Sequence, residues 1–235
     1  MQIEGAVALV TGANRGLGRR FAQQLVARGA AKVYAAVRDP SALDLEGVEP
    51  LRLDITDPGS VRAAAAQAGD VAILVNNAGI ATGANLVTGD PDAIRAEMDT
   101  HFFGTLHMVR AFAPVLAANG GGAILNVLSA LSWFSYDGGT AYCAAKSAEW
   151  SLTNGIRLEL AKQGTLVTAL HLGLTDTDMT KGMSGPKNDP ADVARAGLDG
   201  IAAGLIEVLA DDASRRVKAA LSGDPAALYP GVVRG

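Results

Sequence analysis

The sequence predicts an α/β protein with one doubly wound domain, in which helices flank a central parallel sheet. Short apolar runs alternate with longer helical stretches along the chain, the pattern of repeated strand–helix–strand units. Of the 235 residues, 49% are hydrophobic and 19% are charged, a balance that supports a sizeable core. Because no linker, repeat or charge block divides the chain, we expect a single domain over residues 1–235.

The expected strands are short runs rich in apolar and β-branched residues, as in a sheet that is covered on both faces. In chain order they are Val7–Val10, Lys32–Val37, Leu51–Leu53, Val71–Val75, Ala123–Val127, Leu166–His171 and Val217–Leu221.

The expected helices lie between these strands. In chain order they are Leu17–Arg28, Ser60–Ala68, Asp92–Ala117, Thr140–Ala161 and Pro190–Leu209. A proline inside a helix removes one backbone hydrogen bond, so the third helix could break before Pro114.

Charge and composition argue against several classes of protein. The formal net charge of −4 gives no basic surface for nucleic acid. No apolar run approaches the roughly 18 residues of a membrane span, and the start of the chain lacks the basic region of a signal peptide. The single cysteine, Cys143, excludes an internal disulfide. We expect a cytoplasmic protein.

A glycine-rich turn joins the first expected strand to the first helix. It reads Gly12-Ala13-Asn14-Arg15-Gly16-Leu17-Gly18. Glycines permit a tight turn and let backbone N–H groups approach a pyrophosphate at a helix N-terminus. Three nearby glycines can also form an ordinary turn, but the position between a strand and a helix favours a dinucleotide site of the Rossmann type.

Tyr142 and Lys146 are four residues apart in an expected helix, so both lie on one face. A nearby ammonium group favours the phenolate and should lower the tyrosine pKa from its usual value of about 10. Tyr142 could then act as general acid toward a carbonyl or as general base toward an alcohol. Ser129, at the end of a strand, could orient the substrate oxygen with a hydrogen bond. Taken alone, a tyrosine–lysine pair could equally decorate an exposed helix face.

Together these motifs resemble the short-chain dehydrogenase/reductase family of the classical type. The glycine turn, Asn76-Asn77-Ala78-Gly79, Ser129 and the Y-x-x-x-K motif from Tyr142 to Lys146 follow in the family's order, and the resemblance extends from Val7 to about Met179. It implies hydride transfer between a nicotinamide and a ketone, aldehyde or alcohol carbon. It also implies that Ser129, Tyr142 and Lys146 are catalytic and that Lys146 holds the nicotinamide ribose.

The resemblance further implies a cofactor site that extends along the ends of the strands. Asp54 would bind the adenine amino group, although it could instead cap the helix that begins near Asp57–Ser60. Asn76 is expected to be structural. The implied cofactor-binding residues are Gly12, Asn14, Arg15, Gly16, Leu17, Gly18, Arg38, Asp54, Ile55, Asn77, Ala78, Gly79, Tyr142, Lys146, Thr175 and Thr177. Leu172 replaces the proline that the family usually has before Gly173, which leaves the rigidity of that loop open.

The end of the second strand favours NADP(H) over NAD(H). NAD-preferring enzymes commonly place an acidic residue there to bind the ribose 2′-hydroxyl, and this chain has Val37 at that position. Arg38 and Arg15 offer two guanidinium groups for a 2′-phosphate. Alternatively, both arginines are solvated and Asp39 receives the ribose, so NAD(H) use stays possible.

His101 stands where the family usually has the asparagine of N-x-x-G, which holds a water that links the lysine to solvent. Histidine can exchange protons near neutral pH, so an imidazole could replace the relay that the asparagine holds. Alternatively, backbone groups and water form the relay and His101 fills space. His107 lies six residues after His101, which does not put both on one helix face, and we expect no metal site.

Trp133, Phe134 and Tyr136 are expected to shape a substrate pocket for an apolar or aromatic carbonyl or alcohol, although they could pack on the core or on another subunit. Residues 179–189 are expected to form a mobile lid. The resemblance implies a homodimer or homotetramer that is paired through helices near Asp92–Ala117 and Thr140–Ala161.

Two rival functions remain open from the sequence. One is a catalytically idle relative that binds nucleotide as a redox sensor or regulator, which only the unusual His101 supports. The other is an epimerase or dehydratase on the same fold, which would normally carry a large substrate domain beyond Met179. The natural substrate, its stereochemistry and the direction of the reaction are not determined by the sequence.

Overall fold

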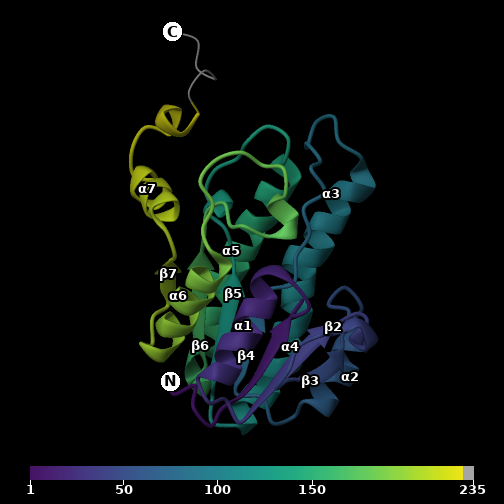
Figure 1. Cartoon of the computed structure of the whole chain (residues 1–235). Coiled ribbons are helices and arrows are strands. Elements are labelled where there is room, and N and C mark those ends of the chain that lie inside the picture. The colour runs from purple at the N-terminus through teal and green to yellow at the C-terminus, as the bar shows by residue number, and fades with distance from the viewer. Residues whose placement is uncertain (230–235) are drawn as a thin grey trace.

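The structure, a computed structural model, describes residues 1–229; the end of the expected domain, 230–235, lies outside the described residues. Seven strands form one sheet in the order β3-β2-β1-β4-β5-β6-β7, and every neighbouring pair is parallel (Figure 1). The doubly wound α/β fold predicted from the sequence is confirmed and is of the Rossmann type. The strands are β1 (Val7–Thr11), β2 (Lys32–Val37), β3 (Glu49–Arg52), β4 (Ile73–Asn76), β5 (Ala123–Val127), β6 (Leu166–His171) and β7 (Glu207–Leu209).

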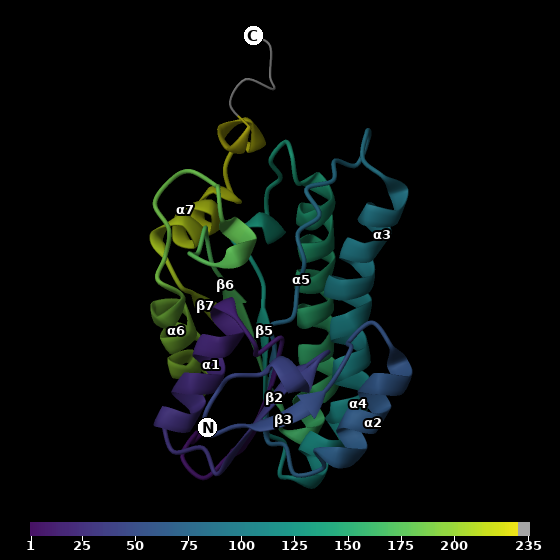
Figure 2. The same ribbon diagram turned by 45° about the vertical axis from the view of Figure 1, so that its right-hand side comes forward.

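Helices cover both faces of this sheet. Figure 2 shows α1 (Gly16–Ala27) and α6 (Pro190–Ala202) on one side, with α4 (Thr105–Ala118) and α5 (Thr140–Leu160) on the other. One core lies under α1 and α6, and the other lies under α2 (Pro58–Gln67), α4 and α5. Both cores consist mainly of branched aliphatic side chains, which explains why the strands lack polar alternation.

The strand order reverses between β1 and β4, and this reversal positions the site. From β1 the chain proceeds to β2 and β3 on one side, whereas β4, β5, β6 and β7 follow on the other. In a doubly wound sheet the loops beyond the carboxyl ends of the two central strands then separate and leave a crevice. Gly12 follows β1 and Asn77 follows β4, so both lie at this crevice.

Aspartate–proline pairs begin three of the α-helices. Asp57, Asp90 and Asp189 are the N-cap residues of α2, α3 (Pro91–Met98) and α6, and each carboxylate accepts a hydrogen bond from a backbone N–H two residues on. Proline follows each of them at the first helical position, where its missing N–H costs nothing. The alternative that Asp54 caps α2 is therefore not adopted, because Asp57 takes that place.

The C-terminal part of the fold differs from the sequence prediction. The helix expected over Pro190–Leu209 ends at Ala202, because Gly204 adopts a left-handed conformation (φ 71°) and the Leu205 N–H donates to the Gly200 carbonyl at 2.9 Å. Glu207–Leu209 then forms the edge strand β7. The strand expected at Val217–Leu221 is wrong, since α7 spans Asp212–Ala220.

The long helix expected over Asp92–Ala117 is interrupted, but not at Pro114. α4 continues through Pro114, whereas residues Asp99–Gly104 form a π-helical turn between α3 and α4. A π turn inserts one extra residue per turn and changes the direction of the side chains that it carries. His101 lies in this turn and is buried.

Candidate active site

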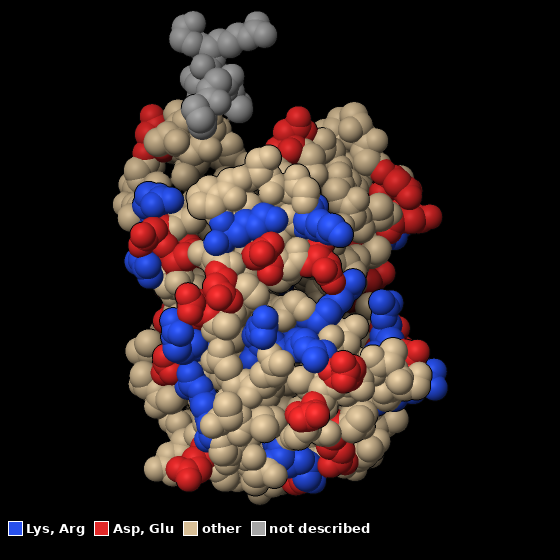
Figure 3. All heavy atoms as spheres, viewed as in Figure 1, with Lys and Arg blue, Asp and Glu red and all other residues tan. Residues whose placement is uncertain are grey.

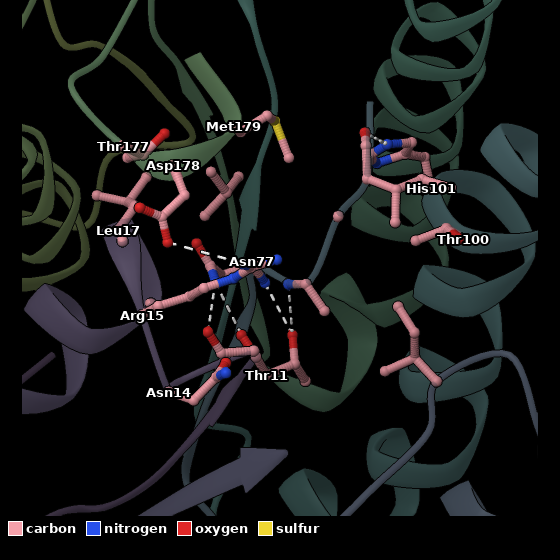
Figure 4. A pocket seen from close by; sticks show the side chains of 18 of the residues that line it. Thr11, Asn14, Arg15, Leu17, Asn77, Thr100, His101, Thr177, Asp178 and Met179 are labelled. Carbon is pink, nitrogen blue, oxygen red and sulfur yellow. Dashed lines mark hydrogen bonds and ion pairs between the residues drawn. The ribbon is translucent and has the colours of Figure 1, made fainter. Parts of the chain in front are cut away.

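A cavity of about 470 Å³ lies at the carboxyl ends of β1, β2, β4 and β5 and is closed on one side by the loop after β6 (Figure 4). It brings together residues that are far apart in the sequence. Of the residues that the sequence analysis assigned to cofactor or chemistry, those that line it are Gly12, Asn14, Arg15, Gly16, Leu17, Gly18, Arg38, Asp54, Ile55, Asn77, Ala78, Gly79, His101, Ser129, Tyr142, Lys146, Thr175 and Thr177.

The glycine turn leaves the start of α1 open toward the cavity. Gly12 and Gly16 have positive φ angles of 67° and 52°, which glycine adopts without strain. A Cβ atom on Gly18 would collide with the carbonyl oxygen of Gly12. In the described chain, Arg15 at the N-cap makes no side-chain capping hydrogen bond. The first N–H groups of α1 are therefore available to a phosphate group.

Thr11 and Asn77 fix this turn against β4. The Asn77 side-chain amide donates to the carbonyl of Thr11 at 2.9 Å, and the Thr11 hydroxyl accepts from the backbone N–H groups of Asn77 and Ala78, each at 2.9 Å (Figure 4). Asn76 instead donates to the side chain of Asn126 on β5 at 2.8 Å, which ties two strands together. The structure thus gives Asn76 a structural contact, as the sequence suggested.

Ser129, Tyr142 and Lys146 meet at the opposite wall of the cavity. Ser129 follows β5 and accepts a hydrogen bond from the backbone N–H of Leu131 at 3.1 Å, which leaves its own hydrogen available. Tyr142 lies in the first turn of α5, and Lys146 follows one turn later. The Lys146 Nζ donates to the Val127 carbonyl at 2.8 Å and lies 5.9 Å from the centroid of the Tyr142 ring.

The pKa of Tyr142 differs from the sequence expectation. Burial raises the pKa of the phenol, and the charge of Lys146 only partly opposes this effect. Glu149 acts in the same direction as burial, and its carboxylate accepts from the Lys146 Nζ at 2.7 Å. The expected lowering is therefore wrong for the protein without its cofactor, where Tyr142 keeps its proton and is ready to act as an acid.

Lys146 stays charged although it is buried. Burial lowers the pKa of its ammonium group, but the nearby charge of Glu149 and the hydrogen bond to its carboxylate oppose this and the pKa is raised. Glu149 was not among the site residues predicted from the sequence. Its position three residues after Lys146 in the same helix could have indicated the pair.

A second buried carboxylate, Glu97, was also missed. It lies on α3, four residues before His101, and accepts hydrogen bonds from the backbone N–H and the hydroxyl of Thr82 at 2.6 and 2.9 Å. Burial would raise the pKa of Glu97, but the hydrogen bonds from His101 and Thr82 outweigh it and the pKa is lowered. The spacing of four residues was again the available signal.

Two arginines approach the cavity at the end of β2 and at the glycine turn. Arg38 and Arg15 are both exposed, and Figure 3 shows basic side chains gathered around the middle of this face. Arg15 lies 3.7 Å from Asp178, across the cavity mouth (Figure 4). Asp39 accepts hydrogen bonds from the N–H and hydroxyl of Ser41, and those bonds lower its pKa. Both hydrogen bonds use the same oxygen of Asp39, so the alternative in which Asp39 receives a ribose stays open.

Asp54 also lines the cavity, and its carboxylate takes part in a local turn. It accepts from the hydroxyl of Thr56 at 2.7 Å and from the backbone N–H at 2.9 Å, both through the same oxygen. These bonds lower the pKa of Asp54 against the opposing effect of burial. The second carboxylate oxygen can still accept a hydrogen bond from a ligand.

The loop after β6 is held by a residue that the sequence analysis did not single out. Asp211 accepts from the Gly173 N–H at 2.6 Å, from the Asn188 side chain at 2.5 Å and from the Ser214 N–H at 2.7 Å. It therefore anchors both ends of the segment that contains the expected lid, 179–189. These hydrogen bonds supply a restraint on the loop that does not depend on a proline at Leu172.

The aromatic residues expected around the substrate do not contribute to the lining of this cavity. Trp133, Phe134 and Tyr136 are not among the described residues that line the cavity. Trp133 stacks on His171, with 3.8 Å between ring centroids, and contacts Trp150 edge-on. The expectation for Trp133 is therefore corrected, because its ring is used between β6 and α5. Its partners come from distant parts of the chain, which the sequence does not reveal.

Among residues 1–229, no group of three or more His, Cys, Asp or Glu side chains could hold a metal ion. None of the helices in this range has the length and apolar character that a membrane crossing requires.

Comparison with known proteins places these features in a family. A family model described as short chain dehydrogenase matches residues 6–188. The chain is 32% identical over 215 residues to an uncharacterised oxidoreductase of Staphylococcus saprophyticus, covering 84% of this chain and 92% of that one. It is 32% identical over 193 residues to the 3-oxoacyl-[acyl-carrier-protein] reductase of Salmonella typhimurium, covering 78% and 79%. A short chain dehydrogenase from Burkholderia cenocepacia, solved in complex with NADP, is 39% identical with a TM-score of 0.94 over 100% of both chains.

Proposed function

The chain belongs to the short-chain dehydrogenase/reductase family and is an oxidoreductase that acts on carbonyl or hydroxyl groups, and from this premise we propose that it is an NADP(H)-dependent carbonyl reductase. The observation that supports the proposal most is the convergence of Ser129, Tyr142 and Lys146 with the glycine turn in one cavity. These residues come from the turn after β1, the loop after β5 and the start of α5, so only the folded chain unites them.

The cavity has features that fit a nicotinamide dinucleotide. The N–H groups at the open start of α1 would bind the pyrophosphate. The glycine turn leaves no room for a side chain at Gly18. Asp54, with Ile55 beside it, would contact the adenine, and Asn77 to Gly79 would pass beside its ribose. Thr175 and Thr177 would hold the carboxamide at the other end. The bound cofactor would supply or accept the hydride.

The protein's own side chains would orient the substrate oxygen and donate the proton to it. Ser129 would donate a hydrogen bond to the carbonyl oxygen and hold it toward Tyr142. Tyr142 would give its proton to that oxygen, consistent with a phenol that burial keeps protonated. The ammonium group of Lys146 would stabilise the phenolate that forms and would hold the nicotinamide ribose.

We propose NADP(H) as the preferred cofactor because Arg15 and Arg38 border the cavity and offer two guanidinium groups to a 2′-phosphate. The NADP bound to the similar Burkholderia structure supports this preference. A mostly reduced cellular NADP pool would then favour reduction of a ketone or aldehyde.

The substrate itself would be a small apolar carbonyl compound. Ile80, Leu172 and Met179 line the part of the cavity near Tyr142 and the lid, and they take the place of the aromatic lining expected from the sequence. We also propose a homodimer or homotetramer that is paired through the region of α4 and α5, where Phe103 and Leu158 are 43% and 79% exposed. A mass measurement in solution tests this assembly.

A substitution of Tyr142 tests the proposed function directly. We expect Tyr142→Phe to bind NADPH as the unchanged protein does, because the ring remains, but to lose turnover of aryl and alkyl ketones by at least about 100-fold. Binding is followed by nucleotide fluorescence and turnover by NADPH absorbance. Cofactor binding with no turnover of any ketone by the unchanged protein would instead favour the redox-sensor function. No binding of NADPH or NADH would refute the proposal.

A further inference from the structure

A buried ion pair lies behind the proposed catalytic residues. The Lys146 Nζ donates to the Glu149 Oε2 at 2.7 Å, and the two side chains are only 6% and 3% exposed. Burying two charges is unfavourable unless they are well hydrogen-bonded, and apolar side chains in place of such a pair often stabilise a protein. Stability alone therefore does not explain a charged residue at position 149.

Glu149 is itself held in place from a second helix. Its other oxygen, Oε1, accepts from the hydroxyl of Thr105 at 2.9 Å, and Thr105 is the buried first residue of α4. Because Glu149 lies on α5, this hydrogen bond joins two neighbouring helices. Both oxygens of the carboxylate thus have donors in fixed positions, which restricts the side chain to one orientation.

The contacts of Lys146 determine where its remaining hydrogen points. An ammonium group has three N–H donors. One donates to the Val127 carbonyl at 2.8 Å and another to Glu149. In the described chain the third makes no hydrogen bond, and Lys146 lines the cavity. With two donors fixed behind it, the ammonium group can offer the third to a ribose hydroxyl in the cavity.

We propose that Glu149 is a positioning residue for the reduction. It fixes the direction of the Lys146 ammonium group so that one N–H faces the cofactor ribose. Its charge also makes the Tyr142–Lys146 pair retain its protons, which favours the role of Tyr142 as an acid. This inference rests on the proposed function, because it names the residue that controls two of the side chains that carry it out.

The effect of the Glu149 charge has the same sign on both partners. Burial raises the pKa of the Tyr142 phenol and lowers that of the Lys146 ammonium group, and the charge of Glu149 raises the pKa of both. A proton therefore leaves the pair at higher pH than it would beside a neutral side chain. Since Tyr142 must carry a proton to reduce a carbonyl, Glu149 extends the pH range of reduction upward.

The other titratable groups around the pair do not replace Glu149. Glu97, from α3, adds a further negative charge nearby but makes no hydrogen bond to Lys146. His101, from the π-helical turn, lies 3.9 Å from Glu149, which is too far for a hydrogen bond. His171, from β6, is neutral because burial lowers its pKa to about 4. Within residues 1–229, Glu149 is the one carboxylate that forms an ion pair with Lys146.

Cofactor binding tests the positioning of Lys146 without any turnover. Glu149→Leu removes the acceptor, so the ammonium group can turn away from the ribose, and we expect NADPH to bind about tenfold more weakly. Lys146→Met should also weaken binding. The double variant should bind as Lys146→Met does, because a residue that acts through Lys146 has no effect once Lys146 is gone. Nucleotide fluorescence measures all three affinities.

The double variant also keeps the test independent of folding, because it leaves neither buried charge without its partner. An affinity of Glu149→Leu equal to that of the unchanged protein would overturn the positioning role. A further loss of affinity in the double variant, beyond that of Lys146→Met, would overturn it as well, since Glu149 would then act independently of Lys146.

Glu149→Gln tests the charge, because it keeps the size of the side chain and an acceptor oxygen for Lys146. We expect the high-pH limb of the kcat profile for reduction to move to lower pH by at least about one unit. The low-pH limb for oxidation of the corresponding alcohol should move equally, because both limbs report the Tyr142–Lys146 pair. NADPH affinity should stay within about threefold. Glu159→Gln, at an exposed position of α5, is the matched control.

The results separate this inference from the proposed function. If Glu149→Gln lowers kcat at every pH but its limbs coincide with those of Glu159→Gln, the inference is overturned while a working reductase remains. If the unchanged protein binds NADPH but turns over no ketone or alcohol, the proposed function fails, and the binding measurements still show whether Glu149 acts through Lys146.

Discussion

At the residue scale, the same side chain serves different purposes in different surroundings. His171 is fully buried, its Nδ1 donates to the Ser129 carbonyl at 3.1 Å, and burial lowers its pKa to about 4. It stays neutral and steadies the backbone of Ser129. His101 is equally buried but lies between two carboxylates, with Glu97 3.3 Å from its Nε2 and Glu149 3.9 Å from its Nδ1. Residue type alone does not distinguish these two situations.

Arg15 and Arg38 provide a prediction at this scale. Replacing both with alanine should weaken NADPH binding by about 10- to 100-fold, because the 2′-phosphate loses two charge-assisted partners. NADH lacks that phosphate, so its affinity should change much less. Titration with both nucleotides measures the ratio. Arg20→Ala, an exposed α1 residue that bonds only to Gln23 among the side-chain contacts described, is the control. Equal losses for both nucleotides would contradict the assignment.

The residues that could be predicted from the sequence are those whose function depends on local spacing. The glycine turn and the pair Tyr142–Lys146 are such cases, and the structure brings them to one cavity. Glu97 and Glu149 have helical spacing to His101 and Lys146 and could have been found in the same way. The stacking of Trp133 on His171 could not, because it depends on how β6 packs beside the loop after β5.

At the element scale, the strands were placed well where the sheet is buried on both faces. β2, β5 and β6 have the predicted bounds, because continuous apolar runs between helices leave few alternatives. The errors lie at the C-terminal edge, where β7 has three residues and Val217–Leu221 is a short apolar run. Such a run fits a strand or a helix equally well. The capping box of Asp211 and Ser214 starts α7 and was the signal that identifies this segment as a helix.

Asp211 also gives the prediction for this scale. Asp211→Asn should lower the free energy of unfolding by about 1–2 kcal/mol at pH 7, because three hydrogen-bond donors lose a charged acceptor. Denaturant unfolding followed by circular dichroism measures it. Asp212→Asn, one residue on and exposed, is the control.

The same residue predicts how that difference depends on pH. Burial would raise the pKa of Asp211, but its hydrogen bonds outweigh burial and lower it below the value of about 4 in the unfolded chain. A carboxylate with a lowered pKa stabilises the fold above the unfolded value, and this stabilisation is lost as pH falls through the folded value. The deficit of Asp211→Asn should therefore be full near neutral pH and should shrink below about pH 4. A deficit that stays constant down to pH 3 would contradict this.

At the scale of the whole molecule, the sheet joins two halves that each supply part of the site. β1 and β2 bring the glycine turn and Arg38, whereas β4, β5 and β6 bring Asn77, Ser129 and Thr175. A ligand in the cavity therefore contacts both halves at once. If residues 1–229 form one cooperative unit, binding at this cavity should stabilise the entire chain and not only the loops around it.

A thermal unfolding experiment tests that coupling. We expect a single transition without cofactor and a single transition at higher temperature with NADPH, because a ligand at 100 times its Kd stabilises the native state by about 2.7 kcal/mol. For a chain of this size that free energy corresponds to a rise in Tm of roughly 5–10 °C. Gly18→Ala should abolish the rise, since its Cβ would collide with the carbonyl of Gly12 where the pyrophosphate is expected. Two separate transitions, with only one moved by NADPH, would show that the halves unfold independently and that the sheet is not one unit.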